Sequence, residues 1–336
     1  MIKIFVQKRW LTVDDYNRRM KELGFYSYEA PDKPQDVPNK GKKLPGKAVS
    51  LWIHVRNFPL IIKPFVQDLD DEVLKLSLLL VEITSRLTAL EFRDYEISIL
   101  EDKIIEFLDV RKEVFESYPD LLGTTKPKHH FLTHYGQAIR LYGPPLTYWT
   151  GRFESKHRIA KNIAETSKNF KNISLTVSVR QMMRMASVYY RGMFETSNFT
   201  LPEKVWYKND LNNSSLKWDK IKEFMSTNDL VCSEIVTNHQ KYANGDIVVL
   251  EVLDGGYELK VGVIETVLVK KNKVFFVVKI YKAAKHPLGY FQSETIGVEA
   301  VFIEAKNIKD FKPLIRHGTA LKFQFVTHHH ISYDNI

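Results

Sequence analysis

One acid among several cations is the residue group best suited to chemistry in this sequence. Glu154 stands between Arg152, Lys156, His157 and Arg158. A carboxylate in this setting can hold a divalent cation beside a phosphate, although metal-dependent phosphoryl transfer needs several converging carboxylates. On a helix the same carboxylate can instead pair with Arg158 one turn later, which contributes about 0.3–0.5 kcal/mol. The spacing alone favours the ion pair.

Histidines provide a second candidate for metal binding. His130 and His134 lie one helical turn apart, a spacing that suits zinc, and His129 and His157 are the candidates to complete such a site. Neither a cysteine ligand nor the glutamate of a zinc-protease helix accompanies them, so packed or solvated histidines are the favoured interpretation. The histidine triplet at residues 328–330 follows a strand pattern, and we expect it at the surface.

Positive charge is concentrated between residues 126 and 192. This segment holds twelve lysines and arginines but only two acids, a net charge of +10, whereas the rest of the chain holds 37 basic and 38 acidic residues. Clustered cations neutralise phosphates and release counterions, which predicts a surface for a polyanion such as DNA; a solvated helical face is the alternative. The candidate nucleic-acid-binding residues are Lys128, Arg140, Arg152, Lys156, Arg158, Lys161, Lys168, Lys171, Arg180 and Arg184.

The composition sets further limits. With 336 residues, 44% of them hydrophobic, the chain is long enough for two domains with cores of their own. A single cysteine, Cys232, excludes an internal disulfide and suits a reducing, intracellular compartment. No apolar run approaches the ~20 residues of a membrane helix, so we expect no membrane partner. The sequence contains no phosphate-binding glycine loop, dinucleotide fingerprint or serine-nucleophile elbow.

Apolar periodicity predicts helices over the first 190 residues. Asp14 or Asp15 can cap the first helix, and Pro59 predicts a kink in the second. The expected helix over residues 97–115 directs Leu100 and Phe107 inward, together with Ile104 and Val114. The expected helices span residues 13–24, 48–65, 70–83, 97–115, 128–141, 148–167 and 175–190.

The last two of these helices carry apolar faces of their own. We expect both faces to pack inward, with the methionines as side chains that fill gaps in the core. The residues on these faces are Trp149, Phe153, Ala160 and Ala164, followed by Val179, Met182, Met183 and Ala186.

From Tyr242 onward the pattern changes to strands. Five segments are rich in β-branched and aromatic residues, with turns between them at 254–256 and 271–273. They predict a small antiparallel β-barrel that resembles an SH3-like module. The fold class is therefore α+β and multidomain, with a helical domain at 1–192, a linker with local structure at 193–240 and the β module at 241–336. The expected strands span residues 246–252, 258–269, 273–283, 298–305 and 321–326.

Several blocks in the basic segment resemble a known family. In their order and spacing they resemble the C-terminal part of transposase-derived proteins related to the CACTA (En/Spm-type) DNA transposons. The resemblance begins near residue 1 and is sharpest over 126–180, and any one block alone is weakly specific. The blocks are residues 126–135, 143–144, Trp149, Arg152-Phe153-Glu154-Ser155-Lys156-His157 and residues 169–173.

This resemblance implies a remnant of an RNase H-like catalytic core. Such a core holds three metal-binding acids, the third on a helix that follows an inserted helical region. Glu154 takes the position of that third acid, the helices over 48–118 would be the insertion, and Mg²⁺ or Mn²⁺ would be the metal. The strands with the first two acids would lie upstream of residue 1. Because one carboxylate cannot position two metal ions, we expect a transposase fragment or truncated descendant that binds DNA without cutting it.

Three hypotheses follow for the function. The favoured one is a transposase-derived, nuclear DNA-binding protein without cleavage activity of its own. The second is a metal-dependent transposase or nuclease that completes its site with further acids or with another polypeptide. The third is an interaction protein whose β module binds a protein partner such as a chromatin component. The oligomeric state stays open at this point.

Overall fold

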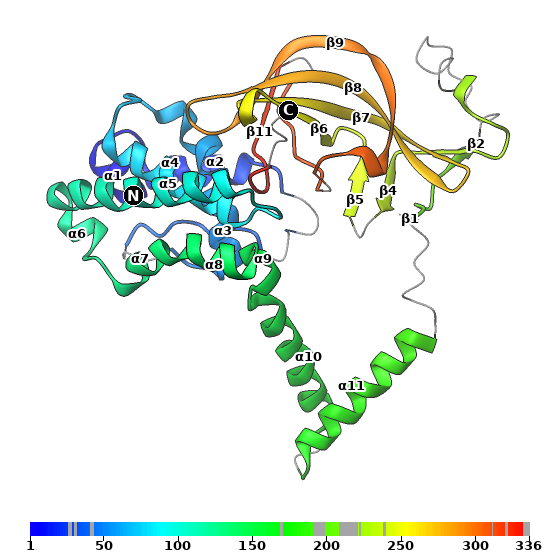
Figure 1. Cartoon of the computed structure of the whole chain (residues 1–336), viewed down its shortest axis with the longest axis horizontal. Coiled ribbons are helices and arrows are strands. Elements are labelled where there is room, and N and C mark those ends of the chain that lie inside the picture. Colours follow the sequence, from blue (N-terminus) through cyan, green and yellow to red (C-terminus); the bar gives the residue numbers. More distant parts are fainter. Residues whose placement is uncertain are drawn as a thin grey trace.

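The chain combines a helical region with a curled antiparallel sheet. The computed structural model describes residues 1–25, 29, 32–40, 44–168, 171–190, 199–207, 221, 223–237, 240–310, 312–319 and 322–331. Side chains are described throughout these ranges except at 151–156, 158, 188 and 295–300. Within the described residues, helices occupy the chain up to Tyr190 and strands begin at Phe199 (Figure 1). The predicted mixed class of helix and sheet is confirmed.

A capping side chain fixes the start of α2. The Thr12 hydroxyl accepts a hydrogen bond from the Asp15 N–H at 3.0 Å, and the Asp15 carboxylate accepts one from the Thr12 N–H at 3.2 Å. Thr12 is therefore the cap, and the prediction of Asp14 or Asp15 in that role is wrong. The elements are α1 (Ile2–Gln7), α2 (Val13–Glu22), α3 (Ala48–Ile62), η2 (Lys63–Phe65), α4 (Glu72–Leu87) and α5 (Asp94–Ser117).

The core of the helical region lies between α3, α4 and α5. The inward face predicted for α5 is confirmed, because Leu100, Ile104, Phe107 and Val114 are all buried. Burial of each such side chain contributes about 1.5–3 kcal/mol relative to exposure. Pro59 lies inside α3. The helix ends three residues later, at Ile62, and the η2 turn follows it.

Shorter helices cover α5 and lead to two long ones. They are α6 (Pro119–Leu122), α7 (Pro127–Phe131), η3 (Leu132–His134), α8 (Tyr135–Tyr142) and α9 (Pro145–Tyr148). The helix predicted over 128–141 is thus divided by the η3 turn, and α8 ends before Gly143, whose φ is 78°. The long helices are α10 (Gly151–Ser167) and α11 (Ile173–Tyr190).

Long antiparallel hairpins dominate the sheet. The hairpin between β7 and β8 turns at Lys271 and Asn272, whose φ values of 47° and 62° suit the right-handed twist of the strands. The described strands are β1 (Phe199–Thr200), β2 (Trp206–Tyr207), β3 (Leu230–Cys232), β4 (Glu234–Thr237), β5 (Gln240–Ala243), β6 (Ile247–Leu253), β7 (Glu258–Lys270), β8 (Lys273–Lys285), β9 (Phe291–Glu304), β10 (His317–Gly318) and β11 (Phe323–Phe325).

The sheet is larger than the five short strands that the sequence predicts. Its strand order is β10-β11-β9-β8-β7-β3-β2, with β6 also paired to β7, and a second sheet has the order β1-β4-β5. Strands β1 to β4 lie in the segment expected to be a linker with local structure. The expected strands correspond to β6, β7, β8, β9 and β11, but β9 begins earlier, at Phe291. The main sheet curls along β7, β8 and β9 (Figure 1).

The sheet is joined to the helical region through a shared core. Leu288 and Tyr290, from the connection between β8 and β9, are buried in the same hydrophobic cluster as α3, α4 and α5. Val326, just after β11, packs against that cluster. Two further clusters of buried side chains lie within the sheet itself. Segments far apart in the chain therefore form one body.

Candidate nucleic-acid interface

Helices α10 and α11 project from this body. Figure 1 shows α10 leaving the helical region after α9 and α11 returning toward the sheet, so that the two helices form a V below the rest of the chain. We call residues 151–190 the arm. The two helices contact each other, and Ala160, Ile163 and Ala164 are half-buried on one side of α10. Ala160 and Ala164, predicted to pack inward, are thus only half-buried.

The other apolar side chains predicted to be core on these helices are exposed. Met182 is 69% exposed and Trp149 is 47% exposed, and Val179, Met183 and Ala186 are exposed as well. The prediction that they pack inward is wrong, because the arm leaves the body and no described element covers this side of α11. Phe153, predicted on the same inward face, has its side chain outside the described residues.

The described cations of the arm face solvent. Lys161, Lys168, Arg180 and Arg184 are exposed, and none of the four takes part in an ion pair among the described residues. Lys171, between the helices, is exposed too. Glu165 is the one acid among the described side chains of the arm. The predicted residues Arg152, Glu154, Lys156 and Arg158 lie on α10, but their side chains are outside the described part of the chain.

At the base of the arm, the predicted residue Arg140 is already engaged. Its guanidinium donates to both carboxylate oxygens of Glu101, at 2.5 and 2.8 Å, and so ties α8 to α5. These hydrogen bonds raise the pKa of Arg140 and lower the pKa of Glu101. Arg140 is therefore less available to a phosphate than the cations of the arm. Lys128, on α7, is exposed.

Exposed aromatic rings accompany the cations at the base of the arm. Phe131, Tyr142, Tyr148 and Trp149 all lie on or beside α7, α8 and α9 with much of their surface in solvent. The rings of Tyr142 and Tyr148 meet edge to face with centroids 6.2 Å apart. Aromatic rings beside basic side chains provide stacking surfaces for nucleic-acid bases. The apolar periodicity of the sequence placed Trp149 in the core, so these exposed aromatic rings were not predicted.

The structure brings together two of the histidines proposed as metal ligands. The Nε2 atoms of His134 and His130 are 3.2 Å apart, with their rings perpendicular and exposed. His129 is turned elsewhere, since its Nδ1 accepts a hydrogen bond from the Lys126 N–H at 3.0 Å. Within the described residues, no three histidine, cysteine, aspartate or glutamate side chains converge as metal ligands.

His328 and His329 are buried and His330 is half-buried, so the prediction that the histidine triplet lies at the surface is wrong. His328, which is 3% exposed, donates from Nε2 to the Pro313 carbonyl oxygen at 3.0 Å and accepts at Nδ1 from an Arg56 nitrogen 2.8 Å away. His330 Nε2 lies 3.1 Å from a carboxylate oxygen of the buried Glu96. The triplet is covered because the chain after β11 passes between the helices and the sheet.

Arg56 is the centre of this buried contact, which we call the junction. Besides His328, its guanidinium binds the buried carboxylate of Glu29 at 2.7 Å and lies 5.1 Å from the centre of the Trp52 ring. Burial, followed by the Arg56 charge, holds the pKa of His328 well below its usual value. A neutral imidazole follows, which matches its acceptance of a hydrogen bond from Arg56.

Asp310 is a second buried acid of the junction. Its side chain is 0% exposed, one oxygen accepts from the Lys312 N–H at 3.0 Å, and the other has no hydrogen-bond partner among the described residues. Burial raises the pKa of Asp310 to about 6, and burial lowers the pKa of His329, 3.8 Å away, to about 4. No spacing in the sequence marks Arg56 or Asp310, because their partners come from distant segments.

A cleft of about 920 Å³ lies beside the junction, between the helices and the sheet. Several of the charged side chains on its helical side are paired with one another. Arg86 binds Glu82 at 3.0 Å, and the Glu106 carboxylate binds Lys103 at 2.9 Å and Lys75 at 3.0 Å. The helical side of the cleft therefore favours neither an anionic nor a cationic ligand.

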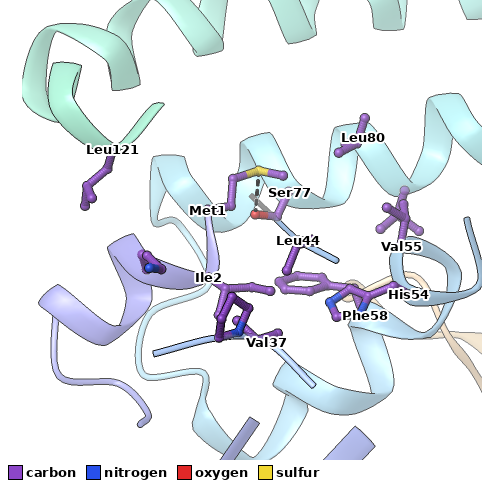
Figure 2. Close-up of a pocket in the computed structure, with 13 residues that line it drawn as sticks. Met1, Ile2, Val37, Leu44, His54, Val55, Phe58, Ser77, Leu80 and Leu121 are labelled. Carbon is purple, nitrogen blue, oxygen red and sulfur yellow. Dashed lines mark hydrogen bonds between the residues drawn. The ribbon is translucent and has the colours of Figure 1, made fainter. Parts of the chain in front are cut away.

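A smaller cavity of about 230 Å³ lies between α1, α3 and α4. Figure 2 shows that apolar side chains such as Ile2 and Phe58 line it, with Ser77 the labelled hydroxyl, which donates to the Met1 sulfur at 3.2 Å. His54 at its edge is held by the buried Tyr16 hydroxyl at 2.8 Å, and burial lowers the pKa of His54 to about 4. The Ser77 hydroxyl and the His54 ring form their hydrogen bonds within the protein. We therefore assign this cavity to packing and propose no reaction for it.

Comparisons with known proteins give no family for the chain. A scan against protein-family models, a search of curated proteins and a search of solved structures each found no match. The resemblance to CACTA transposases thus rests on the sequence blocks alone and stays a prediction. In the described part of the chain, no helix has both the length and the apolar content needed to cross a membrane.

Proposed function

We propose that this chain binds nucleic acid, with DNA as the expected partner, through the arm and the helices at its base. The observation that carries the proposal is the set of exposed cations on the arm, opposed among the described side chains only by Glu165. Exposed cations can release counterions from a phosphate backbone, which is the main source of non-specific affinity for nucleic acid.

The rings at the base of the arm extend this proposal. Tyr148 and Trp149 immediately precede α10, so a strand held by the arm would pass them. Stacking of a base on such a ring contributes about 1–3 kcal/mol and depends little on sequence. The chain is therefore proposed to prefer unpaired or distorted nucleic acid over a regular duplex.

The ancestry predicted from the sequence blocks is part of the same proposal. The helical region would be a remnant of an RNase H-like transposase core with its helical insertion, and the curled sheet an SH3-like module able to contact a protein partner. Glu154 lies on α10, the helix proposed to carry the third acid, and Mg²⁺ or Mn²⁺ would be its metal. Location in the nucleus follows from the expected partner.

Salt-dependent binding tests the proposal. We expect the affinity for a labelled oligonucleotide to fall steeply as salt rises, with a slope of about −0.7 to −0.9 for each phosphate contact. The triple variant Lys161→Gln, Arg180→Gln, Arg184→Gln should lower the affinity at least about tenfold and make the slope shallower by roughly two to three. Fluorescence anisotropy over a salt series measures both quantities.

Lys260→Gln and Lys241→Gln form the matched control. Both lysines are exposed on the sheet and pair with Glu251 and Glu234, far from the arm in the fold. Their replacement should leave the slope unchanged. The proposal fails if the wild-type chain shows no binding at low salt, or if the sheet variants and the arm variants lose affinity equally.

Cleavage is tested separately, because the binding proposal does not require it. Metal-dependent nicking of DNA by the purified chain, abolished in Glu154→Ala, would favour the transposase or nuclease hypothesis. Nicking that persists in Glu154→Ala would remove Glu154 from the mechanism and direct attention to other acids.

A further inference from the structure

We infer that the arm pairs with the arm of a second copy of this chain, along one side of α11. The pairing surface, which we call the seam, consists of Leu175, Val179, Met182, Ala186 and Tyr189. These residues follow one another at spacings of four, three, four and three, which is the a/d pattern of helices that pack side by side. This inference concerns a different surface from the cations that carry the proposed function.

The seam faces away from α10. The half-buried residues of α11 are Thr176, Val177 and Gln181. At 3.6 residues per turn, Val177 and Gln181 lie on the side of the helix opposite Met182 and Ala186, and Thr176 lies between that side and the seam. Helix α10 therefore supports α11 from behind. The seam itself is exposed throughout, and it continues to Tyr190, which is 94% exposed.

The charge pattern of α11 suits pairing with an identical helix. Arg180 and Arg184 lie off the seam, on the sides of the helix nearer α10. In a helix pair, the positions that flank the a/d residues choose the partner, and like charges there prevent self-association. Here no flanking position carries a charge, although the arm as a whole is basic. The flanking residues are Thr176, Ser178, Met183, Met185 and Tyr190.

The exposed apolar area is sufficient for a dimer. Met182, Met183 and Met185 are exposed, as are Leu175, Val179, Tyr189 and Tyr190. At about 150–250 Å² for a fully exposed large side chain, these residues present roughly 800 Å² in each chain, close to the ~800 Å² per partner of a stable, specific interface. An exposed apolar patch of this size is unusual on a monomer and marks an interaction surface.

Other occupants fit the pattern less well. An acidic helix would need its charges at the flanks of the seam, where α11 offers none, since Arg180 and Arg184 lie elsewhere. An anionic membrane would attract the arm, but helices that lie on membranes usually present tryptophan, phenylalanine and leucine on the apolar side, whereas Leu175 is the one such residue in the seam of α11. A second copy needs neither feature.

The oligomeric state of the full chain tests the inference. After nuclease treatment, sedimentation in high salt should show a concentration-dependent dimer, because salt screens repulsion between the arms and leaves the apolar seam intact. Met182→Glu should raise the dissociation constant at least about tenfold, because dimerisation then buries a charge. Ser187→Glu adds the same charge off the seam and should leave the dimer intact.

Cysteine cross-linking gives a second readout that does not depend on a destabilising change. The one native cysteine, Cys232, is buried, so it should stay silent under mild oxidation. Val179→Cys, Met182→Cys and Ala186→Cys place single thiols on the seam, and at least one should form a covalent dimer much faster than Ser187→Cys. Equal or absent cross-linking at all four positions would overturn the inference.

The remaining outcomes each decide the question. A wild-type chain that stays monomeric at high salt and high concentration refutes the pairing. A dimer that disappears on nuclease treatment is bridged by nucleic acid, which also refutes it. A monomer that binds anionic vesicles, and loses that binding in Met182→Glu, assigns the seam to a membrane instead. Nucleic-acid binding weakens as salt rises whereas the dimer should persist, so failure of one proposal is distinguishable from failure of the other.

Discussion

The same kinds of side chain are buried and paired at the junction but exposed on the arm. At the junction, Arg56 is buried and bound to Glu29 and His328, whereas on the arm Arg180 and Arg184 are exposed and take part in no ion pair among the described residues. Apolar residues follow the same division: Leu100 and Ile104 of α5 are buried, whereas the methionines of α11 face solvent.

This difference separates stability from interaction. A charge at the junction must be paired, because an unpaired buried ion costs several kcal/mol. A charge on the arm costs little in the folded chain, and its value lies in what it can bind. Substitutions at the junction should therefore act on folding, and substitutions on the arm should act on binding. The predictions below test that division.

The largest effect is expected at Arg56. Arg56→Met leaves the Glu29 carboxylate buried without its partner at 2.7 Å and removes the donor to His328. We expect a loss of about 3–5 kcal/mol in the free energy of unfolding, because breaking a buried pair strands the other charge. Urea denaturation followed by circular dichroism measures the loss.

Two comparisons sharpen this prediction. The double variant Arg56→Met, Glu29→Leu removes both charges and should recover part of the stability. Arg18→Met breaks the exposed pair with Asp15 and should cost less than about 1 kcal/mol. If Arg56→Met costs no more than Arg18→Met, the junction does not stabilise the fold in the way described.

The pattern of the sequence predicts the long helices and the long strands β6, β7, β8 and β9, and also which face of α5 is buried. Leucines and isoleucines at helical spacing identify a buried face wherever a partner element lies in the same chain. The same pattern in α11 predicted burial for Met182 and Met183, and this was wrong. Periodicity identifies an apolar face but not what covers it, and the contact between α11 and α10 lies on the other side of α11.

The junction could not be predicted for a different reason. His328 and Arg56 are 272 residues apart in the chain, and no local pattern links them. A histidine triplet near a terminus is usually solvated, so burial of His328 follows only from the way the last segment passes between helices and sheet. The nucleic-acid candidates were predicted from charge, yet the pairing of Arg140 with Glu101 also depends on the packing of α8 on α5.

Acid should weaken the fold through the buried histidines. Burial lowers the pKa of His54, His317 and His329 to about 4, and that of His328 well below its usual value. Between pH 6.5 and 4 the unfolded chain therefore binds protons that the folded chain does not, so stability falls as the pH falls. Each such proton contributes about 1.4 kcal/mol per pH unit.

Two buried acids oppose this trend. Burial raises the pKa of Asp310 and of Asp246 to about 6, so the folded chain binds protons there between pH 6 and 4 while the unfolded chain does not. The net loss from pH 6 to 5 should therefore be at most roughly 3 kcal/mol. Asp310→Asn should stabilise the chain above pH 7 and steepen its loss below pH 6. Denaturation at several pH values measures the slopes, and an Asp310→Asn profile parallel to the wild type would contradict this assignment.

A small effect on folding is expected at Trp149, which lies at the base of the arm and so tests the division between junction and arm directly. Trp149→Ala removes a large aromatic side chain, which in a core costs about 3–5 kcal/mol. Because the ring is 47% exposed at the base of the arm, we expect a cost nearer 1 kcal/mol, together with a loss of about five- to tenfold in affinity for a single-stranded oligonucleotide, since one stacking surface contributes about 1–3 kcal/mol.

Leu100→Ala is the matched core variant. Leu100 is fully buried in α5, so its truncation should cost about 2–5 kcal/mol, while the fraction that stays folded should bind the oligonucleotide as the wild type does. Denaturation and anisotropy on the same two preparations separate the effects. A Trp149→Ala chain that loses stability like Leu100→Ala and keeps its affinity would place Trp149 with the core, and the base of the arm would then offer no stacking surface.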